Sequence, residues 1–169
     1  IIYLEATAHN SVSPKRTKAT QRLTLHMTKD TMIGIVIVTH SQLGDALIEA
    51  AEFISGSKPE ATMAVSIDLN ENAEKLRGKI AAAIKKVRQP QGVLILTDMF
   101  GGTPSNLSYS FLEEGKVEVI SGVNLPILIK AASARKEKTL GDLAVTLETF
   151  GKRSISLASG ILKGNKRGN

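Results

Sequence analysis

The sequence contains no cysteine and no tryptophan, and aromatic residues make up only 4% of its 169 residues. The absence of cysteine excludes disulfide bonds, thiolate metal sites and a cysteine nucleophile, and it fits the cytoplasmic location that we expect. The longest apolar run has seven residues, 32–38, far fewer than the ~18 that a membrane-spanning helix needs. The scarcity of aromatic side chains also leaves few surfaces on which nucleic-acid bases could stack.

Positive charge is concentrated at the two ends of the chain. The formal net charge is +6; residues 1–31 contribute +3, residues 152–169 contribute +5, and the segment between them carries −2. We interpret these basic ends as solvated segments. A nucleic-acid interface is the alternative, and the low aromatic content disfavours it, so no nucleic-acid partner is expected.

The chain divides into one domain and two basic flanks. We predict an N-terminal extension over 1–31, a domain over 32–158 and a C-terminal tail over 159–169. Within the extension, the apolar residues at 23, 25 and 27 alternate with polar ones. This alternation leaves an added edge strand as a second interpretation of the extension.

Short apolar runs alternate with longer amphipathic segments from residue 32 onward. Strands are expected over 33–38, 62–67, 92–97, 117–121 and 154–158. Helices are expected over 43–54, 71–88, 104–113, 125–134 and 140–150. Strands that alternate with helices predict an α/β fold of three layers, with helices on both faces of a mainly parallel sheet. The two most apolar strands, the first and the third, should lie at its buried centre.

Two chemically active side chains follow these two central strands. In an open parallel sheet, ligands bind beyond the carboxyl ends of the strands, where the strand order reverses. With the strand order 2-1-3-4, that point lies between the first and the third strand. His40 follows the first strand and Asp98 follows the third. We therefore expect one imidazole and one carboxylate to face the same crevice.

A histidine paired with a carboxylate suits nucleophilic chemistry. A carboxylate that accepts one ring N–H fixes the tautomer and aims the lone pair of the other nitrogen outward. It also stabilises the positive charge that develops on the ring as the histidine attacks an electrophile. On these residues alone a structural histidine and a turn-forming aspartate remain the alternative.

The loop after Asp98 has the composition of an anion-binding turn. Gly101 and Gly102 permit close backbone approach and positive φ angles. Thr103 is a good N-cap, and Pro104 suits the first helical position, so the free amides of this helix start would attract a phosphoryl group. Together with a nucleophilic histidine this loop predicts a phosphohistidine intermediate, whereas an ordinary strand-to-helix connection is the alternative.

Other chemistries find little support in the sequence. A P-loop motif is absent, and one histidine with one aspartate makes a poor metal site because no third ligand is evident. His9 and His26 lie in the N-terminal extension, and we expect neither to be catalytic.

Three motifs together resemble the mannose-family IIA component of the sugar phosphotransferase system. They are GIVIVTH at 34–40, LTDMFGGTPSN at 96–106 and ISGVNLP at 120–126, and the similarity runs over about 32–160. The resemblance implies that His40 receives a phosphoryl group from the carrier protein HPr and hands it to a IIB component in carbohydrate uptake. It implies that Asp98 is the hydrogen-bonding partner of His40 and that Thr103 is the hydroxyl residue of a phosphate loop. Asn106 and Asn124 belong to the matched motifs.

The resemblance also has implications for assembly and partners. It implies a homodimer in which the last strand, 154–158, is antiparallel and exchanged between subunits. No metal or organic cofactor is needed, because the transferred group comes from another protein, and membrane contact occurs only through permease components. A second function stays open: a regulatory interaction module of an incomplete phosphotransferase system, switched by phosphorylation of His40.

Overall fold

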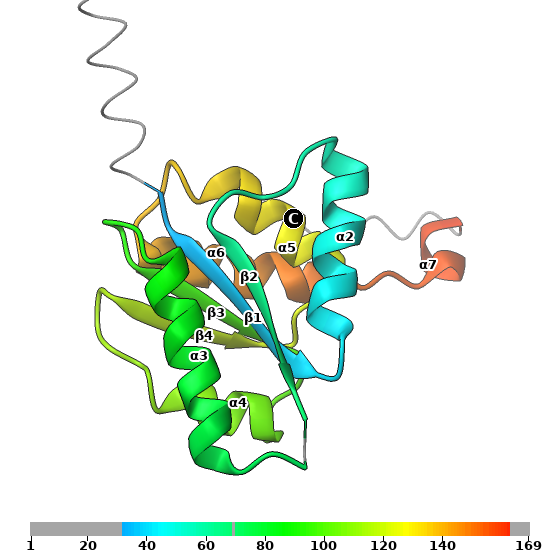
Figure 1. Cartoon of the computed structure of the whole chain (residues 1–169). Helices are drawn as coiled ribbons and strands as arrows, with labels where there is room; N and C mark the ends of the chain where they lie inside the picture. The colour runs from blue at the N-terminus through cyan, green and yellow to red at the C-terminus, as the bar shows by residue number, and fades with distance from the viewer. Residues whose placement is uncertain (1–31, 69, 163–169) are drawn as a thin grey trace, which may run out of the picture.

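The computed structural model describes residues 32–68 and 70–162 (Figure 1). The predictions for the N-terminal extension, including His9, His26 and the alternating segment 23–27, and for the last residues of the tail lie outside the described part of the chain.

The described residues form a three-layer α/β fold around a four-stranded parallel sheet of order β2-β1-β3-β4. The strands are β1 (Gly34–His40), β2 (Thr62–Ile67), β3 (Val93–Thr97) and β4 (Val117–Ser121). The helices are α2 (Leu43–Ser55), α3 (Ala73–Val87), α4 (Thr103–Tyr109), α5 (Leu125–Ala134), α6 (Leu140–Arg153) and α7 (Ala158–Leu162). Figure 1 shows α3 in front of the sheet and α5 and α6 behind it. The predicted fold class and strand order are confirmed.

The core consists of two apolar layers that the strands supply by simple alternation, because successive side chains of a strand point to opposite faces. Ile35 and Ile37 of β1 face α2, α5 and α6, whereas Val36 and Val38 face α3. All four of these side chains are fully buried, as are the apolar residues of β3. Strands β1 and β3 are therefore the centre of the sheet, as their apolar sequences predict.

Close packing of α3 against β1 depends on Gly34, the first residue of β1. A Cβ atom added to Gly34 would lie 2.1 Å from the backbone oxygen of Val87, at the end of α3. Real side chains never approach a carbonyl oxygen so closely, so only glycine allows the helix to end against the strand here.

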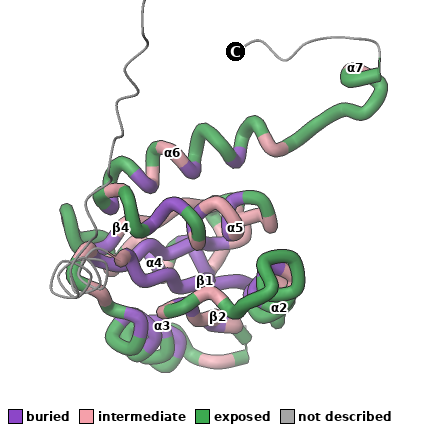
Figure 2. The backbone as a smooth tube through the Cα atoms, turned by 90° about the horizontal axis from the view of Figure 1, so that it is seen from above, coloured by how far each residue is buried: buried purple, intermediate pink, exposed green. Residues whose placement is uncertain are grey.

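The prediction of a last strand over 154–158 is wrong for the single chain. Helix α6 runs to Arg153, residues 155–157 have no regular structure and α7 begins at Ala158. Figure 2 shows this segment leading away from the body of the molecule, exposed along its length. A strand is stable only when a neighbour pairs with its backbone, and no strand among the described residues pairs with this segment.

Helix α4 is also shorter than predicted. It ends at Tyr109, not Glu113, because the backbone N–H groups of Ser110, Phe111 and Leu112 each donate to a carbonyl only three residues earlier. This tight turn leads into the bridge between Glu113 and Val117 that starts β4.

Candidate functional site

The candidate site lies at the carboxyl end of the sheet, between β1 and β3. These strands pair in parallel, with Val38 opposite Thr97, so the residues that follow them emerge side by side. His40 is the last residue of β1, and Asp98 comes directly after β3. From here the chain turns to α2 on one face of the sheet and to α4 on the other, which makes this edge the switch point of the fold.

One carboxylate oxygen holds both the backbone and the ring of the histidine. Oδ2 of Asp98 accepts a hydrogen bond from the backbone N–H of His40 at 2.8 Å, and it lies 2.8 Å from Nδ1 of the same residue. The other oxygen, Oδ1, accepts the backbone N–H of Met99 at 2.9 Å. The structure thus brings the predicted histidine and aspartate together. An ionised carboxylate only accepts hydrogen bonds, so the ring proton belongs on Nδ1, and Nε2 keeps its lone pair.

The electrostatics of Asp98 favour its charged form. Partial burial alone would raise the pKa of Asp98, but hydrogen bonds from the His40 backbone, the His40 ring and the Met99 backbone outweigh it, so the pKa is lowered from its ordinary value. The carboxylate is therefore ionised at neutral pH. In that state it holds the imidazole in one orientation, with the side chain of His40 36% exposed to solvent.

The glycine loop lies directly against the imidazole ring. A Cβ atom added to Gly102 would lie 3.0 Å from Cε1 of His40, the ring carbon bonded to both nitrogens. The loop backbone is therefore beside the edge of the ring that lies between Nδ1 and Nε2. Gly101 has a φ of +78°, a left-handed conformation that glycine adopts without strain. The side chain of Asn106 donates to its carbonyl at 3.3 Å and ties the loop to α4.

The predicted cap of α4 needs correction. Gly102, not Thr103, occupies the N-cap position, and it has an extended backbone and no side-chain cap. Thr103 is the first helical residue and Pro104 the second. Proline fits either place, because the N–H groups of the first turn have no partner within the helix. Asn124, from the third motif, is a structural cap: its side chain accepts the N–H of Ile127 at 2.9 Å and starts α5.

Sequence reasoning missed the way α2 is attached to the site. Ser41, directly after the histidine, has a φ of +49°, which is uncommon for a residue with a side chain. The buried hydroxyl of Thr39 accepts the N–H of Gly44 at 2.9 Å and so satisfies the first turn of α2. A serine gives no sign of a left-handed backbone in the sequence, and the role of Thr39 depends on where α2 packs.

A cavity of about 560 Å³ adjoins the exposed edge of the histidine. Its walls come from the end of β1 and the turn before α2, from the end of β2 and the loop before α3, and from one residue of α3. They are formed by His40, Ser41, Gln42, Ser66, Ile67, Asp68, Glu71 and Lys79. This charged and hydroxyl-rich lining suits a polar or ionic group rather than an apolar ligand.

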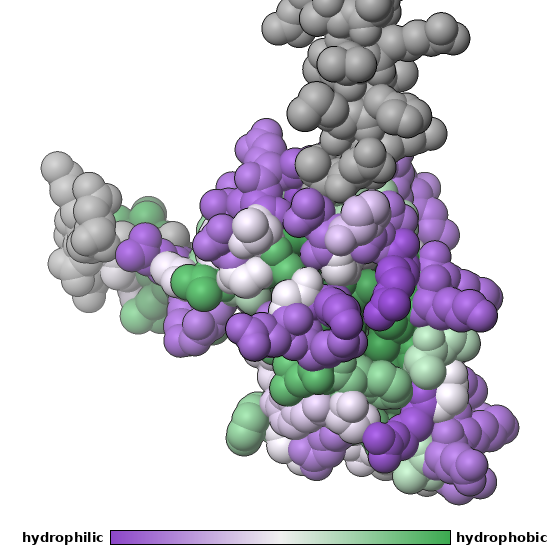
Figure 3. Space-filling view, turned by 90° about the vertical axis from the view of Figure 1, so that its left-hand side faces the viewer, coloured by the Kyte–Doolittle hydropathy of each residue, from purple (hydrophilic) through white to green (hydrophobic). Residues whose placement is uncertain are grey.

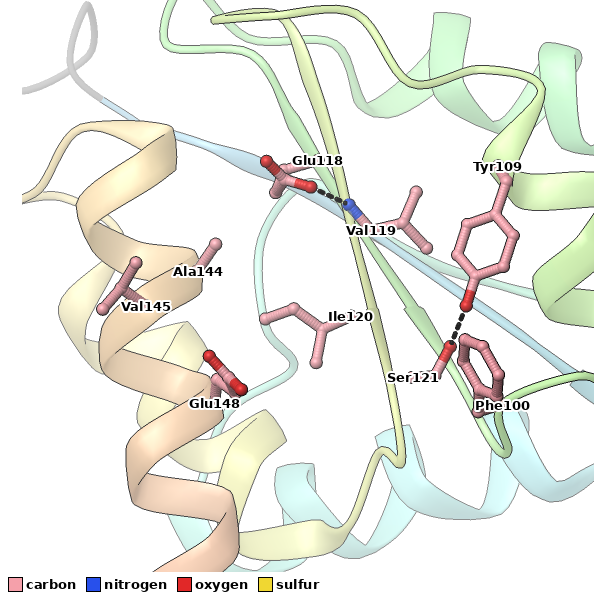
Figure 4. A pocket seen from close by; sticks show the side chains of 9 residues that line it. All are labelled: Phe100, Tyr109, Glu118, Val119, Ile120, Ser121, Ala144, Val145 and Glu148. Atoms are coloured by element: carbon pink, nitrogen blue, oxygen red, sulfur yellow. Dashed lines mark hydrogen bonds between the residues drawn. The ribbon is translucent and has the colours of Figure 1, made fainter.

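A second depression, of about 410 Å³, follows the open edge of β4 (Figure 4). Phe100 and Tyr109 form one wall, with ring centroids 6.3 Å apart, and α6 contributes Val145 and Glu148 on the opposite side. The hydroxyls of Tyr109 and Ser121 lie 3.1 Å apart. This edge belongs to a face on which apolar side chains gather between polar ones (Figure 3).

The described residues show neither a metal-binding cluster nor a membrane-spanning helix. No group of three or more histidine, aspartate or glutamate side chains within 32–68 and 70–162 is arranged to hold a metal ion. None of the helices in these ranges is long and apolar enough to cross a membrane.

Comparison with known proteins gives consistent matches in sequence and in structure. The family model EIIA-man, described as PTS system fructose IIA component, matches residues 34–148. The PTS system fructose-specific EIIA component of Bacillus subtilis is 34% identical over 139 residues, which cover 82% of this chain and 94% of that protein. The PTS system mannose-specific EIIAB component of Escherichia coli K12 is 36% identical over 116 residues, which cover 68% of this chain but only 36% of that longer protein. Among solved structures, the phosphotransferase system component EIIA from Streptococcus agalactiae superposes with a TM-score of 0.68 at 27% identity, over 76% of this chain and 98% of that one.

Proposed function

The chain belongs to the EIIA-man family of sugar phosphotransferase system components, and from this membership we propose that it is a phosphohistidine carrier that accepts a phosphoryl group on Nε2 of His40. The donor in this proposal is HPr, and the acceptor is a IIB component of a carbohydrate uptake system. The observation that carries the proposal is the contact between Nδ1 of His40 and Asp98, which leaves Nε2 as the nucleophile.

The transfer step follows from the proton on Nδ1. The lone pair of Nε2 attacks the phosphorus of the donor's phosphohistidine, a new N–P bond forms, and the donor's own N–P bond breaks. The electron pair of the broken bond returns to the donor nitrogen. The His40 ring keeps its Nδ1 proton and becomes positively charged, and the carboxylate of Asp98 balances that charge. Transfer to the IIB component runs through the same steps in reverse.

The glycine loop is the proposed cradle for the transferred group. Gly102 lies beside Cε1 of His40, the ring carbon next to Nε2, and in this proposal the backbone N–H groups of Gly101, Gly102 and Thr103, with the Thr103 hydroxyl, receive the phosphoryl oxygens. Asp98 approaches the ring from the opposite nitrogen. Its negative charge therefore stays away from the phosphoryl oxygens and does not oppose their binding.

The same proposal includes a homodimer with exchanged C-terminal strands. Among the described strands, β4 has β3 as its single neighbour. None of these strands covers its other edge, where Val117 forms a bridge with Glu113 and the N–H of Val119 donates to the carboxylate of Glu118. Ile155 and Leu157 are 81% and 76% exposed in the single chain. The segment presents two exposed apolar residues on one side, and the open edge of β4 lies near an apolar depression. The two surfaces are therefore complementary.

Intact-mass measurement after incubation with phosphoenolpyruvate, enzyme I and HPr tests the carrier function. The wild-type protein should gain one phosphoryl group that is lost on acid treatment, as phosphohistidine is acid-labile. The His40→Ala variant should gain none, whereas His9→Ala and His26→Ala should be labelled like the wild type. A label that persists in His40→Ala, or no label on the wild type while HPr itself is phosphorylated, would overturn the proposal.

A further inference from the structure

Lys79 is the one cationic side chain that lines the cavity beside His40 in the described part of the chain. The other permanently charged groups on these walls are the carboxylates of Asp68 and Glu71. A phosphoryl group carries about two negative charges near neutral pH. Its arrival on His40 would bring these charges to the border of a cavity whose walls hold two carboxylates and one ammonium group.

Lys79 reaches the cavity because of its place on α3. The helix starts beside the cavity, where the side chain of Asn72 caps it by accepting the N–H of Lys75 at 2.8 Å. Helical side chains lean toward the N-terminus of their helix, so Lys79 extends back along α3 toward Glu71, which precedes the helix. Its Nζ lies 2.5 Å from Oε2 of Glu71, just before the cap.

Glu71 holds two ammonium groups, one on each oxygen. Nζ of Lys75 lies 2.9 Å from Oε1, and Nζ of Lys79 contacts Oε2. These two hydrogen bonds, first that of Lys75 and then that of Lys79, outweigh partial desolvation and lower the pKa of Glu71. One carboxylate needs only one cation to be neutralised. Glu71 would therefore remain neutralised by one ammonium group if the other moved away.

The two lysines differ in where they point. Lys79 lines the His40 cavity and Lys75 does not, although both bind the same carboxylate. The neighbouring Asp68 forms no ion pair with Lys79 in the described part of the chain; its Oδ1 accepts the backbone and side-chain N–H groups of Asn70 at 2.9 Å, and its charge acts on Lys75. Lys79 is thus the cation that can leave Glu71 while Lys75 keeps that carboxylate neutralised.

We infer that Lys79 is a catalytic residue that moves from Glu71 to an oxygen of the phosphoryl group as this group is transferred to His40. The inference rests on the proposed carrier function and adds a residue to it. Lys79 forms no covalent bond; it donates one charge-assisted hydrogen bond, while the N–P bonds form and break as described above. Glu71 is a positioning residue, which stores the ammonium group at the cavity wall until the phosphoryl group arrives.

The matched variants Lys79→Met and Lys75→Met test this assignment. Each removes one ammonium group from Glu71, but only the first removes it from the His40 cavity. Phosphorylation rates are measured by intact mass with two donors, phospho-HPr and phosphoramidate. Phosphoramidate is a small phosphoryl donor without a protein surface that docks on this chain. Lys79→Met should be slower by about tenfold with both donors, Lys75→Met should stay close to the wild type, and Lys79→Arg should recover part of the rate.

Each outcome has one meaning once thermal melting shows that the variants are folded. A Lys79→Met variant as fast as the wild type with phosphoramidate overturns the inference. A loss confined to phospho-HPr also overturns it, because it assigns Lys79 to docking of the donor protein. A wild type that accepts no phosphoryl group from either donor refutes the proposed carrier function instead.

Discussion

Asp98 fixes His40 twice with the same oxygen, at the backbone N–H and at Nδ1 of the ring. The meeting of these two residues could be predicted, because both follow central parallel strands and the strand order reverses between them. The contact of Gly102 with the ring and the reach of Lys79 could not. The first depends on how closely a loop approaches, and the second on the conformation of a long side chain.

Replacing Asp98 by asparagine separates the shape of this carboxylate from its charge. Asp98→Asn keeps the size of the side chain but does not balance the positive charge that forms on the ring, so we expect phosphorylation of His40 to slow by at least about tenfold. The rate is measured by intact mass with phospho-HPr. An unchanged rate in a folded variant would remove Asp98 from the mechanism.

The lowered pKa of Asp98 also predicts how stability depends on pH. A carboxyl group whose pKa is lower in the folded protein contributes stability above its unfolded pKa of about 3.9, and this contribution disappears as the pH falls through the folded value. The wild type should therefore melt at a higher temperature than Asp98→Asn at pH 7, and the difference should shrink below about pH 4. A difference that stays constant from pH 7 to pH 3 would contradict the role of these hydrogen bonds.

At the scale of elements, the sequence predicts best where an element is determined by its own residues. The apolar runs of β1 and β3 and the helical periods of α3 and α5 depend on local alternation and burial, so their positions agree with the prediction to within about two residues. The end of α4 is set by a tight turn that the helical pattern does not reveal. The segment 154–158 has the pattern of a strand but no neighbour within the described chain.

Two glycine-to-alanine substitutions test the packing of β1 against α3. Gly34→Ala forces a methyl group to within 2.1 Å of the Val87 carbonyl, and we expect the free energy of unfolding to fall by about 3 kcal/mol. Gly78→Ala, on α3 itself, meets no atom within 4 Å and should raise the free energy by up to about 1 kcal/mol. Urea denaturation measures both. Equal effects of the two substitutions would contradict the close contact.

At the scale of the whole molecule, the open edge of β4 and the C-terminal segment both lack a packing partner within the described chain. The edge has backbone groups without a neighbouring strand among the described residues. The segment exposes large apolar side chains, namely Ile155, Leu157, Ile161 and Leu162. Exchange between two copies would satisfy both, and this arrangement remains a prediction.

Light scattering of variants in this segment tests the exchange. Ile155 and Leu157 fall on one side of an extended strand and Ser156 on the other. We expect the wild type to be a dimer, the double variant Ile155→Asp/Leu157→Asp to be monomeric at the same concentration, and the control Ser156→Asp to remain dimeric. A monomeric wild type, or a dimer that both variants retain, would argue against exchanged strands.

The identity of the phosphorylated nitrogen tests the central claim most directly. In ¹⁵N-labelled protein phosphorylated with phospho-HPr, long-range proton–nitrogen correlation spectra distinguish a phosphoryl group on Nε2 from one on Nδ1. Because Asp98 holds Nδ1, phosphorylation is expected on Nε2 of His40, with the proton retained on Nδ1. A phosphoryl group on Nδ1 of His40, or on any other residue, would contradict the account.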